Sequence, residues 1–469
     1  MTGHNNRIHF IGIGGTGMSG IAKILMNMGY TVSGSDLKVS EALIRLKDEG
    51  ARVFIGHDAS NVEGADTVVV SSAIPQSNPE YMKAIESNIP LVHRADMLSL
   101  LMSPKKGIAV TGAHGKTTTT SMISSIMEKN GFDPTVVIGG ELNDIGGNAT
   151  LGSGDFLVAE ADESDGSFMK LHPYVAVITN IENDHMDYYK NMNNMKNAFK
   201  KFVNNVDENG FIIFGNDNKY VREIIKETDK KYYTFGINYP SDFMPKNIRM
   251  KGLDTVFEIY FREKLLGEVQ LHVPGIHNVL NAAAAIAVGN RIGANTECMI
   301  EALRTFQGVQ RRFQIVDVVN EVTIIDDYAH HPTEITATLK AARSCDPRKV
   351  YAIFQPHRYT RTQHLADEFG KAFNDADEII ITDIYSAGER PIEGVSSKLI
   401  IDKAKNNGKD FIFIKDKEDI PEYIADKVKP GDYVLTIGAG DISSTSYSIV
   451  QKLKDTFKEE VIGHIPEVN

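Results

Sequence analysis

The residues best suited to chemistry lie in the stretch Gly107–Thr120, where an apolar run ends in glycines, a lysine and four threonines. Glycines let backbone N–H groups approach phosphate oxygens, and a helix that follows directs its positive end toward them. Lys116 adds a full charge, and the Thr117 hydroxyl suits a magnesium ion. The pattern therefore predicts a triphosphate-binding loop with these residues: Gly112, Ala113, His114, Gly115, Lys116, Thr117 and Thr118.

This loop is shorter than the usual P-loop. The usual pattern requires a glycine at position 110, where this chain has Val110. The remaining Thr-Gly-x-x-Gly-Lys-Thr sequence can still wrap a triphosphate with one turn fewer. The alternative is a glycine-rich turn whose Lys116 is only solvated.

Two acidic clusters follow predicted buried strands. One strand, 155–160, leads into Glu160, Asp162, Glu163 and Asp165, and the strand 174–181 leads into Glu182, Asp184, His185 and Asp187. A carboxylate after a nucleotide-binding strand is typical of a metal site. We expect both clusters at one edge of the sheet with the glycine-lysine loop, although solvated loops are the alternative for each.

An earlier glycine-rich segment has a different character. The strand 8–11 is followed by Gly-x-Gly-x-x-Gly and a helical pattern, and Asp36 ends the next strand about twenty residues later. This predicts a Rossmann-like domain that holds a diphosphate, with a turn needed only for packing as the alternative. Ser71 and Ser72 follow the strand 67–70 and are expected at the carboxyl edge of the sheet, where ligands bind, with a plain polar turn as the alternative. The candidate ligands are Gly12, Gly14, Gly15, Thr16, Gly17, Asp36, Ser71 and Ser72.

Charged loops also follow the predicted strands of the last third of the chain. They contain Asp326–Glu334, Gln355–Thr362 and Asp383–Glu389. Because the carboxyl ends of parallel strands share one edge, these loops should line a single cleft. The adjacent His330 and His331 lack helical ligand spacing, so a zinc site is disfavoured.

The elements that position these residues indicate an α/β protein of three domains. We expect a Rossmann-like domain over 1–103, a central P-loop ATPase-like domain over 104–309 with an antiparallel β-rich insert at 211–274, and a second Rossmann-like α/β domain over 310–469. The net charge of −12, without a basic stripe, argues against nucleic-acid binding. Two cysteines fit a reducing cytoplasm, and the most apolar segment, 282–288, is too short to insert into a membrane.

Taken together, several motifs resemble the Mur ligases. They are Thr111–Thr117, Glu160–Asp165, Asn180–Asp187, His277–Asn281, Arg311–Phe313 and Asp327–Glu334. The similarity spans all three domains. The opening glycines, Ser33–Asp36 and the loop His357–Arg361 resemble the members that add L-alanine. The resemblance implies an ATP- and Mg²⁺-dependent cytoplasmic ligase of peptidoglycan precursor synthesis, which joins L-alanine to the carboxylate of UDP-N-acetylmuramate through an acyl phosphate.

The resemblance also implies roles for individual residues. Lys116 would hold the β- and γ-phosphates, Thr117 and Glu160 one magnesium, and His185 a second. Asn278 would face the adenine, Arg312 the γ-phosphate and Asp327 the ATP. The incoming alanine would meet Tyr328, His330, Arg358 and Arg361, and His330 is a candidate base. Several relatives use a carbamylated lysine, but no motif assigns Lys196 or Lys200 to that role.

Three other functions fit parts of the sequence. Within the family, a recycling ligase that joins a whole peptide to the same nucleotide sugar would share every ATP-side motif. An NAD-dependent dehydrogenase would explain the first glycine pattern and Asp36 but would leave Gly115–Thr117 unexplained. A nucleotide switch that binds partners would leave the charged C-terminal loops unexplained.

Overall fold

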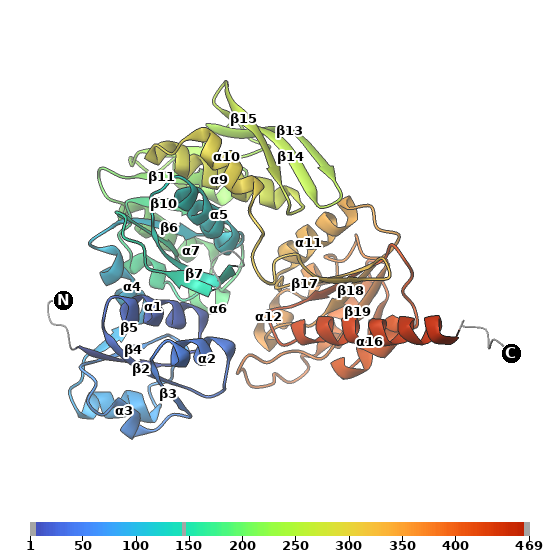
Figure 1. Cartoon of the computed structure of the whole chain (residues 1–469), viewed down its shortest axis with the longest axis horizontal. Helices are drawn as coiled ribbons and strands as arrows, with labels where there is room; N and C mark the ends of the chain where they lie inside the picture. Colours follow the sequence, from blue (N-terminus) through green and yellow to red (C-terminus); the bar gives the residue numbers. More distant parts are fainter. Residues whose placement is uncertain (1–5, 143–146, 464–469) are drawn as a thin grey trace. The chain divides into compact units, whose positions relative to one another are not determined.

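The computed structural model describes residues 6–142 and 147–463 and contains three sheets (Figure 1). The chain divides into two compact units. One comprises 1–248, 257–270 and 279–307, and the other comprises 249–256, 271–278 and 308–469. Among the described residues, no helix combines the length and the apolarity needed to cross a bilayer.

The first sheet is fully parallel, with the order β3-β2-β1-β4-β5. Its strands are β1 (Arg7–Ile11), β2 (Thr31–Asp36), β3 (Arg52–Ile55), β4 (Thr67–Val70) and β5 (Leu91–His93). Its helices are α1 (Thr16–Asn27), α2 (Glu41–Asp48), η1 (Ala59–Val62), α3 (Pro79–Glu86) and α4 (Arg94–Met102). The strand order reverses at β1, which creates a crevice at the carboxyl ends of β1 and β4 where ligands bind in such sheets.

The central sheet has the order β15-β14-β13-β12-β11-β10-β6-β9-β7-β8. Its strands are β6 (Lys106–Thr111), β7 (Thr135–Leu142), β8 (Gly147–Thr150), β9 (Phe156–Glu160), β10 (Val175–Ile178), β11 (Phe211–Gly215), β12 (Tyr232–Phe235), β13 (Phe243–Lys251), β14 (Asp254–Phe261) and β15 (Lys264–Leu271). Its helices are α5 (Lys116–Lys129), η2 (Ser167–Lys170), α6 (Met186–Tyr189), α7 (Met192–Asn204), α8 (Lys219–Ile225), α9 (Ile276–Ile292) and α10 (Thr296–Arg304). Strand β6 lies between β9 and β10, and both pair with it in parallel, so three strand ends meet there.

The predicted antiparallel insert is wrong for its first half. Strand β11 pairs in parallel with β10, and β12 pairs in parallel with β11, so both extend the main sheet. The helix α8 lies between them in the chain, as a parallel crossover requires. Only β13, β14 and β15 follow one another through two-residue connections, which suit antiparallel neighbours.

The third sheet has the order β16-β17-β21-β18-β19-β20. Its strands are β16 (Gln314–Val319), β17 (Val322–Asp327), β18 (Val350–Phe354), β19 (Glu378–Ile381), β20 (Phe411–Phe413) and β21 (Tyr433–Ile437). Its helices are α11 (Pro332–Ser344), α12 (Tyr359–His364), α13 (Ala366–Phe369), α14 (Ser397–Lys405), η3 (Lys417–Asp419), α15 (Ile420–Ala425) and α16 (Ser443–Gly463). All pairs are parallel except the edge pair β16–β17.

The first two sheets share a hydrophobic core. One continuous cluster of buried side chains runs from Phe10 and Leu25 to Phe199 and Phe214. Helix α1 contacts β7 and β8, and α4 contacts η2, which joins the N-terminal sheet to the central one (Figure 1). This packing fixes the carboxyl edge of the first sheet against that of the second. The C-terminal sheet has separate clusters of its own on its two faces.

Candidate functional site

The first glycine loop leaves β1 and enters α1. Gly12 adopts a φ of 80°, and its N–H donates to the carbonyl of Ser35 at 2.8 Å. The Asp36 carboxylate accepts from the Gly14 N–H at 2.9 Å and from the Leu37 N–H at 2.7 Å. A Cβ on Gly14 would lie 2.9 Å from that carboxylate. The candidate ligands of this loop are thus brought together at the crevice, and Asp36 also holds the loop in shape.

The buried carboxylate of Glu80 stabilises the end of β2 through hydrogen bonds. Glu80 is fully buried, and its Oε2 accepts from the Ser35 hydroxyl at 2.5 Å. His9 Nε2 lies 3.2 Å from the same oxygen, and the Asn61 amide donates to Oε1 at 2.6 Å. These bonds fix Ser35, whose carbonyl in turn receives the Gly12 and Ile13 N–H groups. No motif indicated Glu80, because a buried carboxylate on a helix has no sequence signature.

Ser71 and Ser72 follow β4, on the other side of the crevice. Ser72 contacts two partners through its hydroxyl, which lies 2.9 Å from His93 Nε2 and donates to the Asp165 carboxylate. Asp165 belongs to the first acidic cluster. The turn after β4 therefore joins the edge of the N-terminal sheet to the acidic loop of the central sheet.

The second glycine loop leaves β6 and enters α5. Asn180 holds it: the His114 N–H donates to Asn180 Oδ1 at 2.9 Å, and the Asn180 amide donates to the His114 carbonyl at 3.0 Å. The Thr179 hydroxyl donates to the same carbonyl at 2.7 Å. A Cβ on Gly112 would lie 2.2 Å from that hydroxyl oxygen, so only glycine fits there. The loop that the sequence predicted is formed, and the end of β10 braces it.

Lys116 lies inside this loop. Its Nζ donates to the Gly112 carbonyl at 2.7 Å and to Glu163 Oε1 at 2.9 Å. Burial opposes its charge, but the carboxylates of Glu163, Glu160 and Asp162 outweigh burial, so the pKa of Lys116 is raised above its ordinary value. The lysine therefore keeps its charge at neutral pH, as a phosphate ligand must.

The Thr117 hydroxyl and the Glu160 carboxylate form a second contact at the start of α5. The hydroxyl donates to Glu160 Oε2 at 2.9 Å, and the Gly139 N–H reaches the same oxygen at 3.1 Å. Glu160 ends β9 directly beside β6, where Val110 is its register partner. The two predicted oxygen ligands of a metal thus converge.

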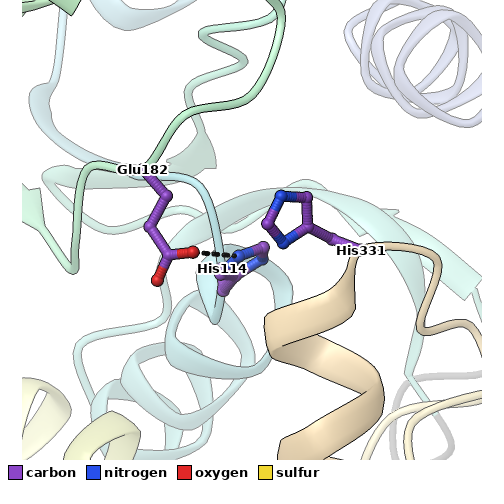
Figure 2. A group of neighbouring side chains, drawn as sticks. All are labelled: His114, Glu182 and His331. Atoms are coloured by element: carbon purple, nitrogen blue, oxygen red, sulfur yellow. Dashed lines mark hydrogen bonds and ion pairs between the residues drawn. The ribbon is translucent and has the colours of Figure 1, made fainter. Parts of the chain in front are cut away.

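His185 brings the second cluster to the first. The residue adopts a left-handed φ of 56° before α6, and its Nε2 lies 3.6 Å from Glu163 Oε1. Glu163 is fully buried between Lys116 and His185, and its Oε2 has no hydrogen-bond partner among the residues that the structure describes. A neighbouring pair, His114 and Glu182, lies 3.3 Å apart at the same loop (Figure 2). The two acidic clusters therefore meet as the sheet order predicts.

The structure separates the two asparagines of α9. Asn281 lies against the phosphate loop. Its Oδ1 accepts a hydrogen bond from the Thr119 hydroxyl at 3.2 Å, and a Cβ added to Gly115 would lie 2.5 Å from the same Oδ1. The buried Asn278 amide donates to the Pro274 carbonyl at 2.8 Å, within its own helix start. Asn281 was not assigned a role from the sequence, although it stands one helical turn beyond Asn278.

In the other unit, Asp327 ends β17 and is buried. Its carboxylate accepts from the Phe313 and Ala329 N–H groups, both at 2.8 Å. Burial raises its pKa to about 6, against the opposing charge of Arg312. Arg312 lies 5.3 Å above the Tyr328 ring and 3.4 Å from the Glu334 carboxylate. Asp327 therefore shapes the loop that carries Tyr328.

The remaining C-terminal candidates lie near His357, which the sequence analysis placed in a motif without assigning it a role. The His330 ring lies 5.9 Å from the His357 ring, and Arg361 Nη1 lies 3.4 Å from His357 Nδ1. Burial, together with the charges of Arg361, Arg358 and Arg311, lowers the pKa of His357 to about 4. Arg358 has an exposed side chain and a left-handed φ of 72°. His330 follows β17, and His357 and Arg358 follow β18, while Arg361 lies just beyond them in the first turn of α12.

His330 itself has a defined orientation. Its Nδ1 lies 3.0 Å from the Tyr328 carbonyl, and its backbone N–H donates to Glu334 Oε2 at 3.0 Å. The next residue, His331, is the N-cap of α11, with Glu334 completing the capping box. His331 therefore serves as a helix cap, a role that the sequence analysis did not assign to it.

Comparison with known proteins gives a consistent result. Family models described as "Mur ligase family, catalytic domain", "Mur ligase middle domain" and "Mur ligase, glutamate ligase domain" match residues 7–106, 110–289 and 311–440. The chain is 51% identical over 453 residues, 96% of its length and 98% of the relative's, to UDP-N-acetylmuramate--L-alanine ligase of Pelotomaculum thermopropionicum. The relative with that name from Geotalea daltonii is 49% identical over 97% of this chain and 100% of its own.

Solved structures agree with the sequence matches. The crystal structure of UDP-N-acetylmuramate-alanine ligase MurC from Thermotoga maritima has a TM-score of 0.83 at 32% identity and covers 96% of this chain and 99% of its own. A murein peptide ligase from Psychrobacter arcticus has a TM-score of 0.72 at 24% identity, covers 96% and 98%, and supports the fold alone. The chain belongs to the Mur ligase family.

Proposed function

We propose that the protein is an ATP-dependent ligase that joins L-alanine to the carboxylate of UDP-N-acetylmuramate in peptidoglycan precursor synthesis. The observation that carries this proposal is the identity of about one half, over nearly the full length, to ligases of that name. The glycine-lysine loop with its converging acidic clusters provides the ATP-driven part of such a reaction. The nucleotide substrates are cytoplasmic metabolites, so we place the enzyme in the cytoplasm.

We assign the three substrates to three segments. Residues 1–103 would hold the UDP-sugar, 104–309 the ATP and 310–469 the amino acid. The diphosphate would lie against the first glycine loop, where α1 begins with N–H groups that have no partner within the helix. The ligands proposed there are Gly12, Gly14, Gly15, Thr16, Gly17, Asp36, Ser71 and Ser72. The NAD-dependent alternative leaves the second loop without a role.

For ATP we propose the second loop. Lys116 would neutralise the β- and γ-phosphates, and the N–H groups of the loop 112–118 would cradle them. Asn278 would face the adenine, and Arg312 and Asp327 would act on the ATP from the C-terminal segment. Asn281 is an additional candidate because it contacts the phosphate loop directly.

Magnesium fits the residues at the start of α5. The Thr117 hydroxyl and the Glu160 carboxylate are hard oxygen donors that already lie 2.9 Å apart, and Glu163 adds a buried carboxyl oxygen, Oε2, that has no partner among the described residues. Thr117 and Glu160 would hold one ion, and His185 would contribute to a second. A bound ion there would neutralise phosphate charge.

The chemistry proceeds in two steps. A carboxylate oxygen of the sugar acid attacks the γ-phosphorus, the bond between that phosphorus and the bridging oxygen breaks, and ADP leaves. The alanine nitrogen then attacks the acyl carbon, the C–O bond to phosphate breaks, and inorganic phosphate departs with one carboxylate oxygen. Lys116 and Arg312 stabilise the charge that develops in the first step.

Alanine's amine must be neutral to attack, so a base must take its proton. His330 is the proposed base. In the tautomer that donates from Nδ1 to the Tyr328 carbonyl, its Nε2 carries the lone pair. Arg358 and Arg361 would hold the alanine carboxylate by charge-assisted hydrogen bonds, and Tyr328 would line the site.

A product assay tests this function. The purified enzyme is given ATP, Mg²⁺ and UDP-N-acetylmuramate with L-alanine, glycine, L-serine or the tripeptide L-Ala-γ-D-Glu-meso-diaminopimelate, and the products are weighed by mass spectrometry. We expect the L-alanyl product as the major one. Preferential ligation of the tripeptide would assign the recycling reaction instead, and absence of any amide would refute a ligase.

A further inference from the structure

A cavity of about 170 Å³ lies within the first unit, between the first turn of α1 and the carboxyl end of β9. The residues that line it come from the start of α1 (Thr16, Gly17), from α4 (Arg94, Leu98) and from the end of β9 (Glu160, Asp162). A space of about 10–15 Å³ already holds one water, so this cavity has room for a small acyl group. It connects the proposed diphosphate site to the proposed metal site.

Arg94 is the one cationic side chain among the described residues that line this cavity. Its Nη2 donates to Asp162 Oδ2 at 3.1 Å. A guanidinium has five N–H donors, and this is the hydrogen bond that the structure gives it. Its Nε and Nη1 atoms take part in no such bond to the described residues and are not among the buried atoms that lack a partner, so both are accessible. Arg94 therefore has donors to offer a ligand.

Two contacts hold the guanidinium in place. Asp162 fixes one side, and the charges of Arg94 and Lys116 overcome the effect of burial and lower the pKa of Asp162 to about 2. On the other side, a Cβ on Gly17 would lie 2.5 Å from Arg94 Nη1 and 3.3 Å from its Cδ. Gly17 has no positive φ, so its lack of a side chain serves this approach. The arginine is preorganised against the first turn of α1.

We propose that Arg94 binds the carboxylate of the nucleotide-sugar acid and holds it between the diphosphate loop and the phosphate-transfer site. The inference rests on the proposed function. The first N–H groups of α1 are available to the diphosphate, whereas the carboxylate must reach the γ-phosphate near Thr117 and Glu160. Arg94 lies between these places, and a planar guanidinium matches a carboxylate with two parallel N–H bonds.

Equilibrium binding without ATP tests the assignment. UDP, UDP-N-acetylglucosamine and UDP-N-acetylmuramate share the diphosphate, and only the last carries the carboxylate. For Arg94→Lys and Arg94→Ala we expect UDP-N-acetylmuramate affinity to fall about 10- to 100-fold, the size of a lost charge-assisted contact. Affinity for the other two should stay within about twofold.

The controls separate folding and function from the inference. Arg52→Lys changes an exposed arginine of the same domain that lies over Phe54, and it should bind all three ligands as the unchanged protein does. Thermal unfolding of each variant checks the fold. If the unchanged protein fails to bind UDP-N-acetylmuramate, the proposed function is wrong. If it binds but the Arg94 variants lose UDP equally, or lose nothing, the carboxylate assignment is overturned.

Discussion

The two glycine loops of the first unit share a backbone plan and differ in charge. Both leave the end of a parallel strand and enter a helix of at least twelve residues, α1 or α5. The first loop holds a carboxylate, since Asp36 accepts from the Gly14 N–H. The second holds a cation, since Lys116 lies between loop carbonyls and Glu163.

This difference indicates which ligand each loop suits. A loop without a lysine relies on backbone N–H groups and a helix end, which is enough to position a diphosphate that does not react. A loop with a charged lysine, a threonine hydroxyl and acidic neighbours can stabilise charge that moves during phosphoryl transfer. Positioning and reaction are therefore assigned to different loops.

The variant Lys116→Ala tests whether the two loops act independently, and it should have the largest effect. We expect kcat to fall by at least about 100-fold, the usual cost of removing one preorganised electrostatic contact to the reacting group, while UDP binding stays unchanged. Lys129→Ala, at the exposed end of the same helix, is the matched control. Steady-state kinetics and calorimetry measure the two effects. An equal loss of UDP affinity would show that the loops are not independent.

Glycine substitutions in each loop test the same independence through smaller changes in KM. In Gly14→Ala the new Cβ would lie 2.3 Å from Leu43 Cδ1, so we expect the KM for UDP-N-acetylmuramate to rise about tenfold with the KM for ATP unchanged. Gly115→Ala should raise the KM for ATP and leave the KM for UDP-N-acetylmuramate unchanged, because its Cβ would lie 2.5 Å from Asn281 Oδ1.

Backbone strain must be separated from this clash. Gly115 has a φ of 82°, and Gly131, at the other end of α5, has a φ of 75° with nothing within 4 Å of an added Cβ. Gly131→Ala therefore carries the strain without the contact. It should lower the melting temperature and leave both KM values alone. If this control also raised the KM for ATP, the effect of Gly115→Ala could not be attributed to the contact with Asn281.

A third strand-end loop, at Asp327 in the other unit, is expected to affect folding stability and not ligand binding. Its carboxyl group has a pKa of about 6, above the ordinary 3.8, so the folded state holds the proton more tightly than the unfolded state does. The contribution to stability is therefore greatest below pH 3.8 and is lost as the pH rises toward 6. The loss is on the order of 2–3 kcal/mol, since one pKa unit corresponds to about 1.4 kcal/mol.

Chemical unfolding at several pH values tests this. Asp327→Asn should flatten the dependence between pH 4 and 6 because the amide does not titrate. A variant with the same pH dependence as the unchanged protein would mean that another group is responsible. No such titration is expected from Lys116, whose charge persists at neutral pH.

The sequence predicted what depends on local pattern. The glycines and lysine of the second loop, and the acids after β9 and β10, lie where strand ends in a parallel sheet must meet. Arg94, Glu80 and His357 could not be found in this way, because their roles depend on packing between elements far apart in the chain. Asn281 was within reach, since it lies one helical turn from Asn278, but which of them faces the loop depends on how α9 packs.

The fold shows the same limit. Strands β11 and β12 were predicted by composition, yet their parallel pairing depends on the crossover through α8, a helix of only seven residues. The edge strand β16 was not predicted. Its exposed and buried residues do not alternate regularly, and its pairing with β17 contains a register shift.

The central claim is that ATP activates the sugar-acid carboxylate before the amine attacks. Isotope transfer tests it most directly: UDP-N-acetylmuramate labelled with ¹⁸O in its carboxylate is ligated to L-alanine, and the released phosphate is examined by mass spectrometry. We expect one ¹⁸O atom in each phosphate, with ADP as the other product. Phosphate free of label, or formation of AMP and pyrophosphate, would contradict it.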